Sequence, residues 1–191
     1  MGQMTVQHEE DAGTGRAGRP DPERAPLLVT LELAQPAQGL FQALRDRHFP
    51  PARNVVPAHV SLFHALPGAE RDAIGRRLRA NPAPRPAVRV EAPFPLGRGV
   101  GFRLHAPALL ALRAALARDW ADWLTPQDRQ GYRPHVTVQN KVAPEEARAT
   151  LDLLQRGFVP FRTEGVALRL WRYLGGPWEA LDRVELAPPE E

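Results

Sequence analysis

Two short segments of this chain repeat one pattern of residues that can carry out acid–base chemistry. His59-Val60-Ser61-Leu62 returns further along as His135-Val136-Thr137-Val138. Because alternate residues of a β-strand point to one face, each segment predicts an imidazole and a hydroxyl side by side, with its aliphatic residues turned into a core. Two such strands brought together would hold two proton carriers and two hydrogen-bond donors, a set of groups able to act on a phosphate.

The chemistry that this set predicts is cleavage of a phosphodiester. Imidazole titrates near pH 6.5, so one histidine can be neutral while the other is protonated at neutral pH. In-line cleavage needs a base on the attacking oxygen and an acid on the leaving oxygen, and His59 and His135 are the candidates for these roles. Ser61 and Thr137 are predicted to donate to the non-bridging phosphate oxygens. These four are the candidate catalytic residues.

The residues that follow the second motif predict contacts with an anion. If that strand is regular, Gln139 and Lys141, the only lysine of the chain, share the face of His135, and Arg133 shares it on the other side. All three are therefore predicted to bind substrate. A lysine on this face opposes a metal cation, and a metal site needs three or four ligands. We expect no metal and no other cofactor.

Aromatic and histidine side chains elsewhere extend this interpretation. Phe94 and Tyr173 occupy equivalent turns of the two halves, and both are predicted to stack against a nucleobase. His64 has the opposite parity to His59 and is expected on the core side of its strand. No Gly-x-Ser-x-Gly segment supports a serine hydrolase, and no P-loop is present.

Hydrophobic periodicity predicts the elements that must position these residues. Alternating apolar residues predict strands at 27–34, 58–65, 88–92, 100–104, 134–142, 165–173 and 180–186. Apolar residues at helical spacing and proline at helix starts predict helices over 36–47, 69–80, from 107 to about 124, and 144–156.

The order of these elements repeats, which predicts an internal duplication. The expected fold class is α+β and bilobal, with pseudo-two-fold duplicated antiparallel sheets, helices on the outer faces and a central cleft. A two-fold axis between the lobes would bring His59 and His135 into that cleft. Residues 1–26 are predicted to be a disordered N-terminal tail, 27–187 a single bilobal domain, and 188–191 a C-terminal tail.

Composition limits the class of protein further. The absence of cysteine excludes a disulfide framework and a thiolate nucleophile. No apolar run approaches the ~18 residues of a membrane span, and no signal peptide is evident. We therefore expect a cytoplasmic protein, most simply a monomer, that does not contact membranes. The net charge of +3 fits a polyanionic substrate but does not by itself predict nucleic-acid binding.

At its two histidine motifs the chain resembles the 2H phosphoesterase superfamily, particularly the bacterial 2′-5′ RNA ligase and RNA 2′,3′-cyclic phosphodiesterase group. That superfamily carries two H-x-[ST]-x motifs on a duplicated, bilobal α+β fold. Residues 132–134 and 171–178 also look like this group. The resemblance implies an enzyme that opens 2′,3′-cyclic phosphates of RNA ends or small cyclic nucleotides to 2′-phosphates without a metal. Several members of the group also join RNA ends through a 2′-5′ linkage.

The resemblance also assigns roles to individual residues. It implies that His59 protonates the leaving 3′ oxygen and His135 activates water, with the reverse assignment left open by the pseudo-symmetry. Lys141 lies near a position where many relatives have an arginine. Two other functions remain open: a non-catalytic RNA- or nucleotide-binding module that uses the same cleft, and a phosphoesterase for another cyclic phosphodiester.

Overall fold

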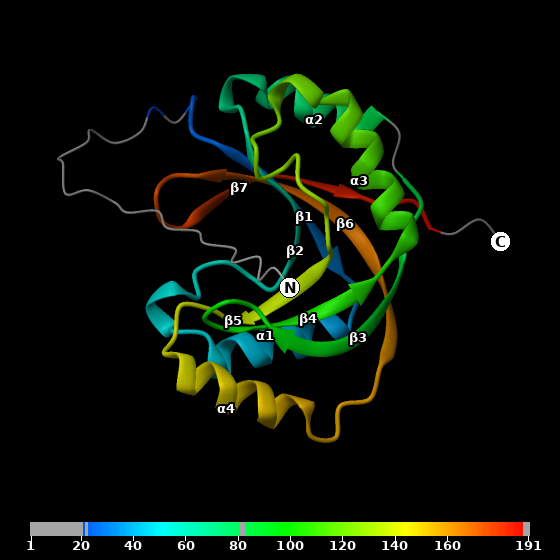
Figure 1. Cartoon of the computed structure of the whole chain (residues 1–191). Coiled ribbons are helices and arrows are strands. Elements are labelled where there is room, and N and C mark those ends of the chain that lie inside the picture. The colour runs from blue at the N-terminus through cyan, green and yellow to red at the C-terminus, as the bar shows by residue number, and fades with distance from the viewer. Residues whose placement is uncertain (1–20, 22, 81–82, 189–191) are drawn as a thin grey trace, which may run out of the picture.

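The computed structural model describes residues 21, 23–80 and 83–188 of the chain. Every predicted helix and strand is present within a few residues of its predicted bounds (Figure 1). In chain order the elements are β1 (Leu27–Leu33), α1 (Ala37–His48), β2 (Val60–Leu66), α2 (Arg71–Ala80), β3 (Ala87–Pro95), β4 (Val100–His105), α3 (Pro107–Asp119), β5 (His135–Gln139), α4 (Pro144–Gln155), β6 (Phe161–Tyr173) and β7 (Trp178–Glu185).

The predicted duplication is confirmed, and its repeating unit is strand–helix–strand–helix–strand. The first unit runs from β1 to β3 and the second from β4 to β6, with a histidine motif at the middle strand of each. The two units exchange their last strands, since β3 pairs with β4 of the second unit and β6 pairs with β1 of the first. The α+β class is therefore as predicted, but the two halves share one sheet.

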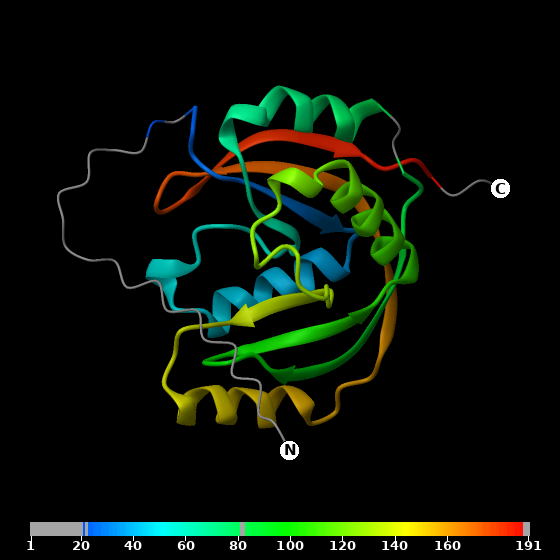
Figure 2. The same ribbon diagram turned by 45° about the horizontal axis from the view of Figure 1, so that its top comes forward.

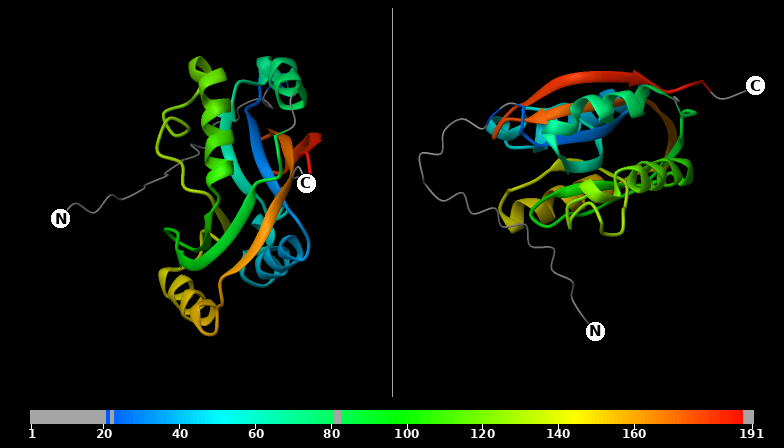
Figure 3. Two further views of the ribbon diagram at one scale, coloured as in Figure 1. Left: turned by 90° about the vertical axis from the view of Figure 1, so that its right-hand side faces the viewer. Right: turned by 90° about the horizontal axis from the view of Figure 1, so that it is seen from above.

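This sheet closes on itself. Its order is β1-β2-β5-β4-β3-β6-β7. The first six strands form a ring, which β6 completes by pairing with β3 through residues 161–164 and with β1 through residues 165–172, while β7 pairs with β6. Figure 3 shows β6, in orange, linking the group formed by β1, β2 and β7 to the group formed by β3, β4 and β5. At the opposite side of the ring the two histidine strands meet through one residue pair, Val60 with Val136. The two motifs thus lie at the junction of the two halves.

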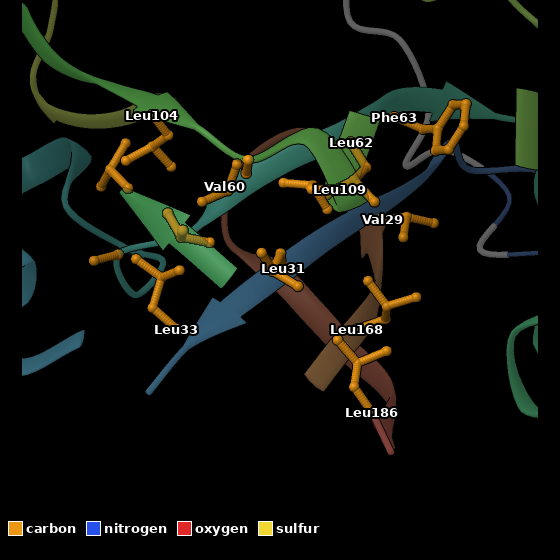
Figure 4. Close-up of a cluster of buried hydrophobic side chains, with 14 of the residues drawn as sticks. Val29, Leu31, Leu33, Val60, Leu62, Phe63, Leu104, Leu109, Leu168 and Leu186 are labelled. Atoms are coloured by element: carbon orange, nitrogen blue, oxygen red, sulfur yellow. The ribbon is translucent and has the colours of Figure 1, made fainter. Parts of the chain in front are cut away.

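The apolar residues of the strands face one shared core. Figure 4 shows side chains from β1, β2, β4 and β6 converging with Leu109 of α3. Phe41 of α1 joins the same core and contacts Phe102 of β4, with ring centroids 5.3 Å apart. Gly165 lies where β6 passes from one group of strands to the other. A Cβ there would lie 2.6 Å from Leu31, so only glycine fits against this core side chain.

A β-bulge interrupts each histidine strand at the same place after its motif. In β2, Ser61 and Phe63 pair with adjacent residues of β1. In β5, Thr137 and Gln139 pair with adjacent residues of β4. One extra residue in each strand leaves two consecutive side chains buried and reverses the facing of the residues that follow. Predictions that assumed regular alternation beyond this point are therefore wrong.

The ends of the chain and its helices bear on the remaining predictions. The predicted tails, 1–26 and 188–191, lie mostly outside the described residues. Ala25 is nevertheless buried, so packed structure begins before the predicted boundary at residue 27. Among the described residues, no helix has the length and apolar character needed to cross a membrane.

Candidate active site

The register of β2 and β5 places each histidine across from the hydroxyl of the other motif. The strands are antiparallel, so the positions on either side of their one bridging pair are also opposed. His59 therefore lies opposite Thr137, and His135 lies opposite Ser61. All four side chains are partly exposed, and they face away from the core. We call this the site face of the sheet.

Each imidazole is fixed by the backbone in the same way. The Nδ1 of His59 lies 2.7 Å from the carbonyl oxygen of Pro57, and the Nδ1 of His135 lies 2.9 Å from that of Arg133. Because a carbonyl oxygen only accepts, Nδ1 must carry the hydrogen in both rings. When the rings are neutral, the two Nε2 atoms are the free acceptors. Both histidines thus present the same nitrogen for proton transfer.

The surroundings of the two rings favour their neutral forms. Burial lowers the pKa of His59 from 6.5 to about 4, and it also lowers the pKa of His135. The hydrogen bond to the backbone carbonyl acts in the opposite direction at each ring but is outweighed. The positive charge of Arg45 lowers the pKa of His59 further. At pH 7 the protein without substrate therefore holds both rings mainly uncharged.

Arg45 contacts the second motif, and the sequence analysis did not single it out. Its guanidinium is buried, and burial lowers its pKa to about 10. It donates to the carbonyl oxygen of Thr137 at 2.9 Å, to Asn54 Oδ1 at 3.1 Å and to the carbonyl oxygen of Val56 at 3.3 Å. A single side chain from α1 thereby ties the second motif to the segment that leads into His59. Sequence alone gave no signal for this role, because α1 approaches β5 only in the folded chain.

A second arginine makes the reciprocal contact. Arg113, on the helix before the second motif, donates to the carbonyl oxygen of Leu62 in the first motif at 3.5 Å. Its guanidinium also lies over the ring of Phe63, 4.7 Å from the centroid. Each helix that precedes a motif thus supports the strand of the other motif.

An aromatic ring lies against each histidine. Phe94 meets the His135 ring edge-to-face at 5.9 Å, and Trp178 lies 5.0 Å from the His59 ring. Figure 2 shows that the β3–β4 and β6–β7 hairpins, which carry these rings, end on the same side of the molecule. Tyr173 pairs with Trp178 across the second hairpin and is 39% exposed. The aromatic neighbour of His59 is therefore Trp178, which the sequence analysis did not single out. Base stacking by Phe94 and Tyr173 stays a prediction.

Gln139, Lys141 and Arg133, the three predicted polar contacts with substrate, do not lie together on the site face. Gln139 is 1% exposed, and its amide donates to Thr150 Oγ1 at 3.0 Å, so its predicted place on the site face is wrong. Lys141 is exposed, but β5 ends before it and its φ of 59° shows that the regular strand does not reach it. The Arg133 side chain is exposed, and its carbonyl holds His135.

A cavity of about 220 Å³ extends from His59 over the first half of the sheet. It is lined by polar and aromatic side chains of β1, β6 and β7, among them Thr30, Glu32, Arg169, Trp171 and Arg183. Glu32 pairs with both arginines, at 3.3 Å and 2.9 Å. Within the described part of the chain, no three His, Cys, Asp or Glu side chains are grouped so that they could hold a metal ion.

Comparison with known proteins places the chain in a family. A model of the 2′-5′ RNA ligase superfamily matches residues 32–177, whereas no curated protein sequence matches the chain. Among solved structures, TT0787 of Thermus thermophilus has a TM-score of 0.58 at 19% identity, over 86% of this chain and 100% of that one. E. coli LigT complexed with 3′-AMP has a TM-score of 0.56 at 17% identity, over 86% and 99%.

The family match includes both histidine motifs and most of the described fold. The structural neighbours have the same overall fold, although their identity to this chain is low. The predicted resemblance is thereby confirmed: the chain belongs to the 2′-5′ RNA ligase superfamily of 2H phosphoesterases.

Proposed function

We propose that this protein is a phosphodiesterase that opens 2′,3′-cyclic phosphates to 2′-phosphates, with His59 and His135 as its acid–base pair. The observation that carries the proposal is the crossed register, in which each imidazole lies opposite the hydroxyl of the other motif. A phosphorus atom between the two strands would have a proton carrier on either side. It would also have hydroxyl donors from Ser61 and Thr137 for its non-bridging oxygens.

The reaction follows from the free Nε2 atoms. One neutral imidazole takes a proton from water, whose oxygen attacks the phosphorus. The bond from phosphorus to O3′ breaks, and the other imidazole, protonated at Nε2, gives its proton to the leaving oxygen. The resemblance assigns the acid to His59 and the base to His135. The negative charge of a bound phosphate would favour the protonated acid that burial disfavours in the free protein.

The same groups would support 2′-5′ ligation. If a 5′ hydroxyl took the place of water, the base would remove its proton and the P–O3′ bond would still break. The product would then be a 2′-5′ phosphodiester, and no residue would change its role. Exclusion of water and capture of the second RNA end would decide the balance between the two outcomes.

An asymmetric distribution of charge favours an RNA end over a small cyclic nucleotide as substrate. Arg103 lies directly opposite His135 and is exposed, with its guanidinium 5.1 Å from the centroid of Phe94. Across the same sheet, Arg89 and Arg162 are opposed and exposed. None of the three has an ion pair among the described residues. They would attract the backbone of a nucleic acid.

Hydrolysis of adenosine 2′,3′-cyclic phosphate in the presence of a chelator tests the proposal. The wild type should release the 2′-phosphate, and His59→Ala and His135→Ala should each lower kcat by ~10²–10⁴. His48→Ala, at the end of α1, is the matched control and should retain full activity. Activity that survives both substitutions, or that chelator abolishes, would refute the mechanism. Binding without turnover would favour the alternative of a non-catalytic module.

A further inference from the structure

A third histidine lies on the site face of β2. The bulge after Ser61 leaves Leu62 and Phe63 both buried and turns His64 outward. The imidazole of His64 is 39% exposed. The expectation that His64 lies on the core side of its strand is therefore wrong, because that expectation assumed regular alternation.

A buried carboxylate holds this imidazole in one orientation. Asp128 is 2% exposed and accepts from His64 Nδ1 at 3.0 Å and from the backbone N–H groups of His64 and Ala65 at 3.0 and 3.1 Å. Thr125 Oγ1 contacts the same carboxylate at 3.4 Å. Burial alone would raise the pKa of Asp128, but these hydrogen bonds outweigh it and hold the pKa below its usual value. The carboxylate is thus charged and can balance an imidazolium.

The segment that carries Asp128 is itself fixed. Arg113 donates to the Asp128 carbonyl oxygen while its other nitrogen contacts the backbone of β2. The carboxylate is therefore not a mobile surface group that happens to meet a histidine. Since Nδ1 of His64 is occupied, Nε2 is the nitrogen available to a ligand.

His64 lies near the catalytic pair but too far along the strand to contact the same phosphate. His64 follows His59 by five residues along the same strand, and the bulge turns it to the face that carries His59 and Ser61. At about 3.3 Å per residue, the bulged segment from Ser61 to His64 spans roughly 10 Å. The oxygens of a single phosphate cannot bridge that separation.

We propose that His64, oriented by Asp128, is a substrate-binding residue that donates from Nε2 to a second, uncleaved phosphate of an RNA end. This inference rests on the proposed function and deepens it, because it makes a strand of at least two nucleotides the preferred substrate. A mononucleoside cyclic phosphate has no group for this position. The second half offers no equivalent imidazole, since its corresponding residue is Asn140, whose Oδ1 accepts the N–H of Lys141.

Two substrates that differ by one nucleotide test this assignment. Adenosine 2′,3′-cyclic phosphate has only the scissile phosphate, whereas adenylyl-(3′→5′)-adenosine 2′,3′-cyclic phosphate adds one uncleaved phosphate. His64→Gln should raise KM for the dinucleotide about tenfold. It should leave kcat for the dinucleotide, and both constants for the mononucleotide, within about twofold of the wild type. An equal change in KM for both substrates, or none for either, would overturn the proposal.

Controls separate binding from folding and from the proposed function. Asp128→Asn should reproduce the selective rise in KM, and thermal unfolding should show whether either variant loses structure. His48→Gln should leave the ratio of the two KM values unchanged. If the wild type cleaves neither substrate, the proposed function fails, but His64 is still tested by titration with the uncyclised dinucleotide 3′-phosphate. A tenfold weaker Kd in His64→Gln would support the site, and an unchanged Kd would refute it.

Discussion

The two halves of this molecule build the candidate active site with the same parts and surround it with different ones. Each half contributes a histidine held at Nδ1 by a backbone carbonyl, a hydroxyl across from the other histidine, and an aromatic ring against the imidazole. Each strand has a bulge at the same distance from its motif. Each preceding helix sends an arginine to the strand of the other motif.

The surroundings of the centre differ in charge. On β6 and β7, beside β1, Arg169 and Arg183 are paired with Glu32, and Arg172 is paired with Glu179 at 3.0 Å. In the second half, Arg103 is exposed on the site face with no ion pair among the described residues. The third imidazole, His64 held by the buried carboxylate of Asp128, has no counterpart after the second motif, where Asn140 stands.

This difference indicates how a symmetric centre can act on an asymmetric substrate. The proposed proton transfer needs two imidazoles, one protonated and one neutral, and the duplication supplies one from each half. A cyclic phosphate at an RNA end has a strand on one side and a terminal ribose on the other. The features that distinguish these two sides must come from residues that the duplication does not repeat.

The largest expected effect concerns the division of labour between the histidines. One ring must be protonated and the other neutral, and both pKa values lie below 6.5 in the free protein. The kcat/KM should therefore be highest below pH 6.5 and fall about tenfold per pH unit above the higher pKa, ~100-fold from pH 6.5 to 8.5. A pH–rate profile measures this directly.

Histidine variants sharpen that comparison. His59→Asn and His135→Asn should each remove one limb of the residual profile, the alkaline limb where the acid is lost and the acidic limb where the base is lost. Loss of the same limb in both variants would show that the halves do not have complementary roles. A wild-type optimum at pH 8 would contradict the effect of burial on the two rings.

Substitution of Arg45 and Arg113, which make reciprocal contacts with the two motif strands, should give the next largest difference in kcat. Arg45→Met removes donors from three acceptors, including the Thr137 carbonyl, so kcat should fall about tenfold with little change in KM. Arg113→Met removes a long contact to Leu62 and the contact to the Asp128 carbonyl, neither of which reaches a catalytic candidate, and kcat should fall about twofold. Partial recovery of kcat in Arg45→Lys would support a positioning role. A rise in KM alone would instead indicate direct contact with substrate.

These contacts show which parts of the molecule its sequence could predict. Apolar alternation and helical spacing identified every α-helix and β-strand of the described residues, because each buries apolar residues in one core. The repeated motif identified the candidate catalytic residues, and the two motif strands do meet at the junction of the halves. The contact between Arg45 and Thr137 joins residues far apart in the chain, and nothing in the local pattern of α1 marks it.

The errors near the site have one physical origin. Periodicity assigns faces only while a strand is regular, and the bulge after each motif reversed the assignments of His64 and Gln139. Leu62 with Phe63 reads as an ordinary apolar pair, so the sequence does not reveal the extra residue. Gln139 is buried because α4 supplies Thr150 as its partner, which is a tertiary effect.

A smaller effect on RNA binding should distinguish Arg103, which has no ion pair among the described residues, from the ion-paired Arg183. Arg103→Gln should weaken binding of a short single-stranded RNA about threefold and reduce the slope of log Kd against log salt by ~0.7. Arg183→Gln, which loses pairs with Glu32 and Glu185, should leave that slope unchanged. Equal salt slopes for Arg103→Gln and Arg183→Gln would show that the uneven distribution of unpaired arginines does not direct RNA binding.

Lys141 should give the smallest effect, although it is the only lysine in the chain. It lies beyond the end of β5, and its φ of 59° places its backbone in the left-handed region. Asparagine adopts that region more readily than lysine, so Lys141→Asn should preserve the local turn while removing the charge. We expect kcat/KM within about twofold of the wild type for a cyclic mononucleotide. A tenfold loss would mean that the turn, and not Arg103 on the site face, supplies the cation of the second half.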